Sequence, residues 1–226
     1  MQQSRFGSSR ARRGISPSSR NAPPPFRRKP LFEALEQRVL LSADPLLLAA
    51  TPGESLDVTV RTRADAGATF VDIVDNADQV VIVSRDLAST SEVVIQGGAG
   101  NDVVRLGAGA GALPFLFDGG GGSDRLVGAD LAAEWQVTGR NAGQVGAAGF
   151  TNVEYLQGGL ANDTFLVAAV GGLDGSIDGG IGAYDTVVLS GGVFDLVAYE
   201  SFAPDAGAIR RDADLLRYAG MEPIID

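Results

Sequence analysis

The 226-residue chain contains neither cysteine nor histidine, and these two absences exclude several kinds of chemistry. Without cysteine the chain has no disulfide, no thiol nucleophile and no thiolate zinc site. Without histidine it can build neither a Ser-His-Asp triad nor a histidine-based metal centre. Carboxylates, hydroxyls, arginines, one lysine and backbone carbonyls remain. Among metals, these oxygen ligands suit a hard cation such as Ca²⁺.

A long apolar run is also missing. The most apolar N-terminal stretch, residues 31–50, is interrupted by Glu33, Glu36 and Arg38, so it predicts neither a membrane span nor a conventional secretory signal. Pro30 favours the start of a short helix, which should end before Asp44-Pro45. The apolar face of this helix would consist of Leu31, Phe32, Leu35, Val39 and Leu40.

Charge is divided unevenly along the chain. Residues 1–40 carry nine basic and two acidic side chains, whereas residues 41–226 carry nine basic and 26 acidic ones, a net charge of −17. Residues 1–30 are rich in Arg, Ser and Pro and contain no acid, which predicts a disordered basic tail. Such a tail can be a solvated segment, a targeting segment or a phosphate-binding arm. No base-reading module follows it, so nucleic acid is not the expected partner.

The segment LEQRVLLSADP, residues 35–45, resembles the LEPR-XLL motif of large, repetitive bacterial surface or secreted proteins. The matching residues are Leu35, Glu36, Arg38, Leu40 and Leu41. Residues 42–45 match the usual continuation of the motif, and Gln37 stands where the family has proline. The resemblance implies that residues 31–50 are a sorting segment for export machinery. It also implies an extracellular or cell-surface location.

Residues 51–94 predict a small β-rich unit. SLDVTVRT alternates apolar and polar residues, and FVDIVDNADQVVIVSR contains two apolar runs on either side of a turn at 75–78. We expect this unit to be an antiparallel hairpin that caps the sheets following it, because an uncovered sheet edge invites aggregation.

From residue 95 onward a glycine-rich unit occurs four times, as IQGGAGNDVV, FDGGGGSDRL, LQGGLANDTF and IDGGIGAYDTV. Apolar-polar alternation on both sides indicates strands, and the glycine pair allows a sharp turn through positive φ. The copies begin at Gly97, Gly119, Gly158 and Gly179, so their spacings are 22, 39 and 21 residues. These spacings predict an all-β fold, a parallel β-solenoid in which neighbouring copies stack and residues 135–156 supply one further coil. An antiparallel sandwich with glycine-rich loops is the competing fold.

The four copies resemble the hemolysin-type, or repeat-in-toxin, consensus, whose turns bind calcium. The resemblance implies two incomplete Ca²⁺ sites, one on Asp102 with Asp124 and one on Asp163 with Asp185, to which Asp118 and Asp178 would add charge. The candidate metal-binding residues are Gly97, Gly98, Gly100, Asp102, Gly119, Gly120, Gly122, Asp124, Gly158, Gly159, Asp163, Gly179, Gly180 and Asp185. The same residues also suit plain turns in which Asn and Asp bond their own backbone.

The sequence therefore predicts a basic tail (1–30), a sorting helix (31–50), a β-rich cap (51–94) and a repeat region (95–226) that continues in a longer protein. We expect a non-enzymatic structural or adhesive module with a cell-surface or polysaccharide target. The alternative is a polysaccharide-acting β-helix enzyme, with Glu134, Glu154 and Asp195 as candidate acids. No Gly-Lys-Ser or Gly-Lys-Thr follows the glycines, so they form no phosphate loop, and Trp135 is expected in the core.

Overall fold

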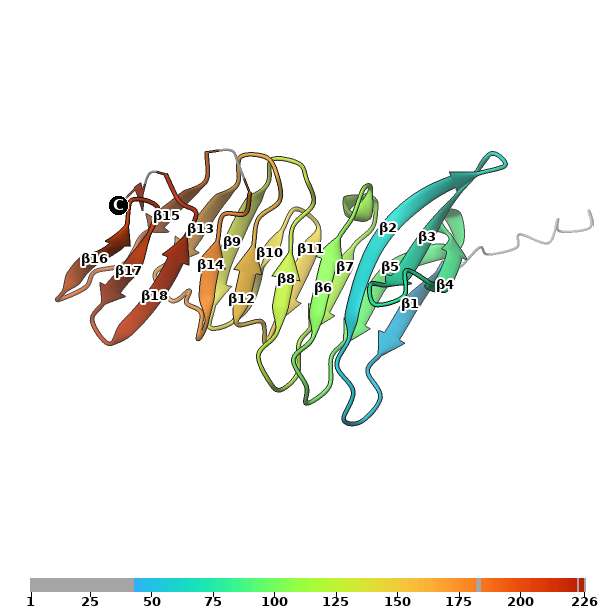
Figure 1. Ribbon diagram of the computed structural model, residues 1–226, viewed down its shortest axis with the longest axis horizontal. Helices are drawn as coiled ribbons and strands as arrows, with labels where there is room; N and C mark the ends of the chain where they lie inside the picture. Colours follow the sequence, from blue (N-terminus) through green and yellow to red (C-terminus); the bar gives the residue numbers. More distant parts are fainter. Residues whose placement is uncertain (1–42, 182–183, 223, 226) are drawn as a thin grey trace, which may run out of the picture. The chain divides into compact units, whose positions relative to one another are not determined.

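The computed structural model describes residues 43–181, 184–222 and 224–225, which form an all-β fold of two large mixed sheets (Figure 1). Helical structure in these residues is limited to two single 3₁₀ turns, η1 (Leu87–Ser89) and η2 (Ala110–Ala112). Accordingly, no helix of this described part is long and apolar enough to cross a membrane. The basic tail (1–30), the sorting motif (35–41) and residues 31–42 of the expected sorting helix lie outside the described residues. The remainder of that expected helix is described and contains the strand β1, Asp44–Ala49.

Sheet A has nine strands in the order β1-β5-β7-β11-β10-β9-β13-β15-β19, and sheet B has ten in the order β16-β17-β18-β14-β12-β8-β6-β2-β3-β4. The strands of sheet A are β1 (Asp44–Ala49), β5 (Thr90–Gln96), β7 (Phe115–Asp118), β11 (Ala148–Thr151), β10 (Ala142–Val145), β9 (Glu134–Gly139), β13 (Thr164–Ala168), β15 (Thr186–Ser190) and β19 (Ile224–Ile225). Those of sheet B are β16 (Val197–Ala203), β17 (Ala206–Arg211), β18 (Asp214–Ala219), β14 (Ser176–Asp178), β12 (Tyr155–Gln157), β8 (Arg125–Val127), β6 (Val103–Leu106), β2 (Asp57–Asp65), β3 (Ala68–Asp75) and β4 (Val81–Asp86).

Over most of its length the chain alternates between the two sheets, and each strand pairs in parallel with the strand of the same sheet from the next passage. We call one passage, a strand of sheet A and the strand of sheet B that follows it with their turns, a coil. Ile95 of β5 pairs with Phe117 of β7, and Val104 of β6 pairs with Leu126 of β8. All four side chains are fully buried, because alternation along each strand turns every second residue toward the space between the sheets. The result is one continuous apolar core along the stack.

Two sets of turns connect the sheets. The A-to-B edge includes turns 50–56, 97–102, 119–124, 152–154, 169–175 and 191–196. The B-to-A edge includes turns 87–89, 107–114, 128–133 and 158–163 and, among the described residues, 179–181 with 184–185. Backbone hydrogen bonds join stacked turns: the Gly97 amide donates to the Asp118 carbonyl on the first edge, and the Gly158 amide donates to the Asp178 carbonyl on the second. The first two glycine-rich copies therefore lie on the A-to-B edge, and the last two lie on the B-to-A edge.

The 39-residue gap between copies two and three holds the further coil that its length suggested, because β11 and β12 pair in parallel with β7 and β8. It also holds an addition that the sequence did not predict: β9, β10 and β11 form an antiparallel meander within sheet A before the chain enters β12 in sheet B. Asn141 (φ 52°) and Gly146 (φ 56°) supply the left-handed conformations that reverse the chain at the two hairpins. The two added strands leave β9 and β11 running in the same direction, so the next glycine-rich copy lies on the opposite edge because it follows β12 of sheet B.

The N-terminal part is a β-unit joined directly to the stack. β2 pairs in parallel with β6 and antiparallel with β3, and β3 pairs antiparallel with β4. The turn expected at 75–78 joins β3 and β4, with Asp75 Oδ1 accepting from the Ala77 amide at 2.8 Å. The expected domain boundary after residue 50 is corrected, because β1 belongs to sheet A and pairs with β5. The short apolar run of β1 suits a helix or a strand equally well, and the pairing with β5 decides in favour of a strand.

Candidate functional site: the aspartate turns

The copies whose spacings are near 20 residues are neighbours, as the sequence predicts. Copies one and two are flanked by the parallel pairs β5·β7 and β6·β8, and copies three and four by β12·β14 and β13·β15. The Asp102 amide donates to Asp124 Oδ1 at 2.7 Å, and the Asp163 amide donates to Asp185 Oδ1 at 2.7 Å. Each expected aspartate pair is thus brought together.

The four carboxylates point into the turns and not toward solvent. Their exposed fractions are 0% for Asp102 and Asp124, 1% for Asp163 and 4% for Asp185. Asp102 Oδ1 accepts the Leu56 amide of the preceding coil at 2.6 Å, while its Oδ2 accepts the Gly98 amide of its own turn at 2.8 Å. A buried acid therefore satisfies backbone donors that the strands leave unpaired where the chain turns.

The same arrangement is repeated on the opposite edge. Asp163 Oδ1 accepts the Ala133 amide of the preceding coil at 3.0 Å, and Asp163 Oδ2 accepts the Gly159 amide of its own turn at 2.9 Å. We call the two rows of turn acids the aspartate ladders: Asp102, Asp124 and Glu154 on the A-to-B edge, and Asp163 and Asp185 on the B-to-A edge.

The asparagine before the first aspartate of each ladder makes the reciprocal bond. Asn101 Oδ1 accepts the Ser123 amide at 2.9 Å, and Asn162 Oδ1 accepts the Tyr184 amide at 3.1 Å. Local turns in which these Asn side chains bond only their own backbone were the alternative from sequence. The structure shows bonds across coils instead, so an Asn-Asp pair links each turn to the next in both directions.

Glu154 is a member of the first ladder that the consensus did not identify. Its Oε2 accepts the Asp124 amide at 2.8 Å, and its Oε1 accepts from Asn141 Nδ2 at 2.9 Å. A sequence signal was present: Leu156, two residues after Glu154, pairs with Leu126, two residues after Asp124. The repeat is thus defined by an acid followed two residues later by an inward-facing apolar residue, and a turn can belong to it without the glycine pair.

The first glycine of each pair is needed for close approach. A Cβ on Gly97 would lie 2.5 Å from Asp102 Oδ2 and well inside contact distance of the Gly119 carbonyl oxygen, and Gly158 meets the equivalent atoms of its own ladder. Positive φ, which the sequence suggested for the pair, applies to the second glycine in two copies, Gly120 (85°) and Gly180 (109°). Packing between coils therefore explains the first glycine and backbone conformation explains the second.

The residues assigned to calcium by resemblance are a poor fit to an ion cage. Ca²⁺ takes six to eight oxygen ligands, whereas both oxygens of Asp102 and of Asp163 accept backbone amides. Asp118 Oδ1 accepts from the Gly120 amide and from Asn152, and Asp178 Oδ1 accepts the Gly180 amide. Within the described ranges, no three or more acidic side chains gather as a metal-binding group. The donor set fits backbone capping.

Burial changes the acidity of the ladders. Asp124 Oδ2 is buried without a hydrogen-bond partner, and burial, with the charges of Asp102, Glu154 and Asp118, raises the pKa of Asp124 to about 6. The Asp102 amide opposes this shift by bonding the charged form. Burial also raises the pKa of Asp163 and of Asp185.

The three acids of the enzyme alternative lie on different elements. Glu154 is held in the first ladder, Glu134 on β9 accepts from Gln136 Nε2 at 2.9 Å, and Asp195 lies between β15 and β16. Trp135 is fully buried and stacks on Phe165 at 5.3 Å between ring centroids, so it is a core residue as expected.

Fold and turns together define an all-β protein of two mixed sheets joined by stacked, acid-capped turns. No protein-family model, no curated protein and no solved structure matches the chain.

Proposed function

We propose that the described residues form a parallel β-solenoid with inserted hairpins, acting as a non-enzymatic structural or adhesive module of an exported bacterial surface protein. The observation that carries the proposal is the pair of aspartate ladders. A buried carboxylate that bonds one turn to the preceding coil is a device for stacking coils. Chains stacked in this way are stabilised by nearest-neighbour contacts and suit extended, rigid supports.

The surface location rests on the resemblance of residues 35–45 to LEPR-XLL. A chain in which Leu40 and Leu41 are both changed to Asp should remain with the cells of a bacterial host that exports the unchanged protein. Immunoblots of cell and culture fractions would measure this. Equal export of both proteins would remove the motif from the proposal.

In this proposal coil cohesion comes from hydrogen bonds, and calcium is not required. The test is thermal unfolding of the full chain in about 5 mM CaCl₂, in the same concentration of MgCl₂ and in chelator. We expect the same Tm in all three, because a ligand specific to the folded state would raise stability by RT ln(1 + [L]/Kd). A calcium-specific rise of several degrees would instead support the ion sites implied by the resemblance.

No catalytic role is proposed, because Glu154 accepts a backbone amide within the first ladder and the three candidate acids lie on different elements.

A further inference from the structure

The meander creates a mismatch between the two sheets. In sheet B, β6 and β8 are direct neighbours, but in sheet A the strands that follow them, β7 and β9, are separated by β11 and β10. With neighbouring strands ~4.8 Å apart, β7 and β9 are ~14 Å apart. The turns 107–114 and 128–133 therefore begin close together at sheet B and diverge toward sheet A.

On the A-to-B edge this extra width is filled by the β9–β10 hairpin. The Asn141 amide donates to the Gly172 carbonyl at 2.9 Å, and the Asn141 carbonyl accepts the Val153 amide at 3.0 Å. Its side chain bonds Glu154 and Asp174. On the B-to-A edge the corresponding filler is only the short β10–β11 turn, which consists of Gly146 and Ala147.

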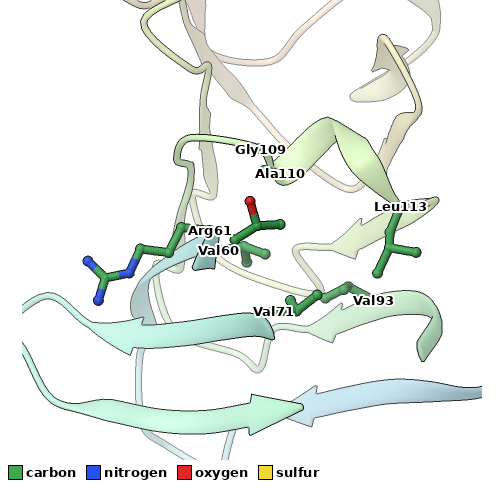
Figure 2. A pocket seen from close by; sticks show the side chains of 8 residues that line it. Val60, Arg61, Val71, Val93, Gly109, Ala110 and Leu113 are labelled. Carbon is green, nitrogen blue, oxygen red and sulfur yellow. The ribbon is translucent and has the colours of Figure 1, made fainter. Parts of the chain in front are cut away.

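A groove consequently opens on the B-to-A edge. Its main part has a volume of about 500 Å³, within the range of small-ligand sites. A second part of about 430 Å³ shares Leu106, Gly107 and Leu131 with the first, so the two form one elongated depression. By contrast, the apolar cavity beneath Ala110 and Leu113 measures about 10 Å³, and Arg61 points away from it (Figure 2). That cavity is too small to hold a ligand.

One wall of the groove carries a row of polar side chains above an apolar floor. Gln144 Nε2 donates to Gln136 Oε1 at 3.2 Å, and Gln136 Nε2 donates to Glu134 Oε1 at 2.9 Å. Gln136 and Gln144 are cross-strand partners on β9 and β10. Each glutamine side-chain amide has an NH₂ group that donates and a carbonyl oxygen that accepts hydrogen bonds, and hydroxyl groups can bond to both. Leu106 and Leu131 offer apolar contact for the C–H face of a sugar ring.

The charges in and around the groove restrict the class of ligand further. Arg105, Asp130 and Glu134 are the charged residues that line the two parts of the groove, on a body whose residues 41–226 carry a net −17. This field repels nucleic acids, acidic polysaccharides and anionic lipids. We propose that the groove binds a short stretch of neutral, hydroxyl-rich glycan. The proposal rests on the adhesive part of the proposed function and names its class of target.

The test is titration calorimetry of the full chain with neutral hexasaccharides (cello-, xylo-, malto- and chitohexaose), hexagalacturonate and a neutral Ala-Ser peptide. At least one neutral sugar should show saturable binding. Gly111→Trp is the blocking variant, since Gly111 lines the groove and a Cβ there meets nothing within 4 Å. It should weaken binding at least tenfold (about 1.4 kcal/mol), as should the double change Gln136→Ala and Gln144→Ala.

Val170→Trp is the matched control, because Val170 is exposed in the 169–175 turn on the other edge; it should leave binding unchanged. Circular dichroism confirms that each variant is folded. Three results would overturn the proposal: no saturation by any neutral sugar up to about 10 mM, undiminished binding by Gly111→Trp, or preferential binding of the peptide or hexagalacturonate. None of these would affect the ladder and calcium measurements, so failure of the groove and failure of the solenoid module remain distinguishable.

Discussion

At the scale of single residues, the unusual feature is a set of buried acids with few counter-charges. Burial of a carboxylate is costly unless its oxygens accept hydrogen bonds. Asp102 and Asp163 meet this requirement with two backbone amides each, whereas Asp124 meets it with only one of its two oxygens. The repeat thus uses aspartate because its short side chain carries two acceptors, one for its own turn and one for the preceding coil.

Removal of one ladder acid should be strongly destabilising. Asp102→Ala leaves the half-buried Leu56 and Gly98 amides without their acceptor, and we expect the free energy of unfolding to fall by about 2–4 kcal/mol. Urea denaturation measures the change. Asp205→Ala, at an exposed position, is the control and should be within about 0.5 kcal/mol of the unchanged protein. Equal effects of the two substitutions would contradict the ladder.

The raised pKa of Asp124 predicts a stability change with pH. Its folded value of about 6 exceeds the ordinary 3.8 of an unfolded chain, so the folded state binds the proton more tightly. The resulting stabilisation is fully present below about pH 4 and is lost as pH rises through about 6. Stability attributable to this group should therefore increase as pH falls from 7 to 5, and Asp163 and Asp185 act in the same direction.

Asp124→Asn isolates that contribution, because its Oδ1 can still accept the Asp102 amide. Urea denaturation between pH 4 and 8 should give a flatter pH profile for the variant than for the unchanged protein. Parallel profiles would mean that Asp124 titrates alike in the folded and unfolded states.

At the scale of elements, the sequence predicted much of the structure. Alternating apolar residues identified the strands around each turn, and the spacings of 22 and 21 paired the copies correctly. The meander was missed, because apolar alternation does not say whether the next strand returns parallel or antiparallel. The reversal depends on positive φ at Asn141, a non-glycine residue whose conformation is fixed by partners distant in sequence.

Asn141 should therefore be critical to the meander. Asn141→Ala removes side-chain bonds to Glu154, Asp174 and the Asp174 amide, and also places alanine at φ 52°. Asn141→Gly loses the same bonds but accepts the left-handed conformation. Thermal unfolding should show Ala to be more destabilising than Gly by about 1 kcal/mol. The reverse order would show that backbone conformation at residue 141 is unimportant.

At the scale of the described fold as a whole, its C-terminal hairpin depends on one buried cation. The Arg211 guanidinium is 2% exposed, donates to the Ala168 and Gly171 carbonyls and to Asp214, and lies over the Phe194 ring at 5.4 Å. These contacts join β17 of sheet B to the turn after β13 of sheet A. The planar fork of arginine suits several acceptors at once, a geometry that lysine does not reproduce.

Arg211→Lys should loosen this end without unfolding the coils. We expect faster proteolytic cleavage within residues 191–213 and a loss of about 1–3 kcal/mol in local stability, measured by limited proteolysis with mass spectrometry. Arg210→Lys, on an exposed neighbouring position, serves as the control. Cleavage spread evenly through the chain would show that Arg211 supports the entire fold.

The same acid-capped corner serves in both directions of travel, since copies one and two lead from sheet A to sheet B and copies three and four lead back. Because the same corner connects the sheets in either direction, the fold can be extended by a single strand and its corner, and not only by a complete coil. The inserted hairpin leaves β9 and β11 running in the same direction, so the corners keep alternating between the edges and the aspartate moves from one set of corners to the other. Half a coil, which is one strand and one corner, is therefore the smallest unit by which evolution or a designer can lengthen such a chain.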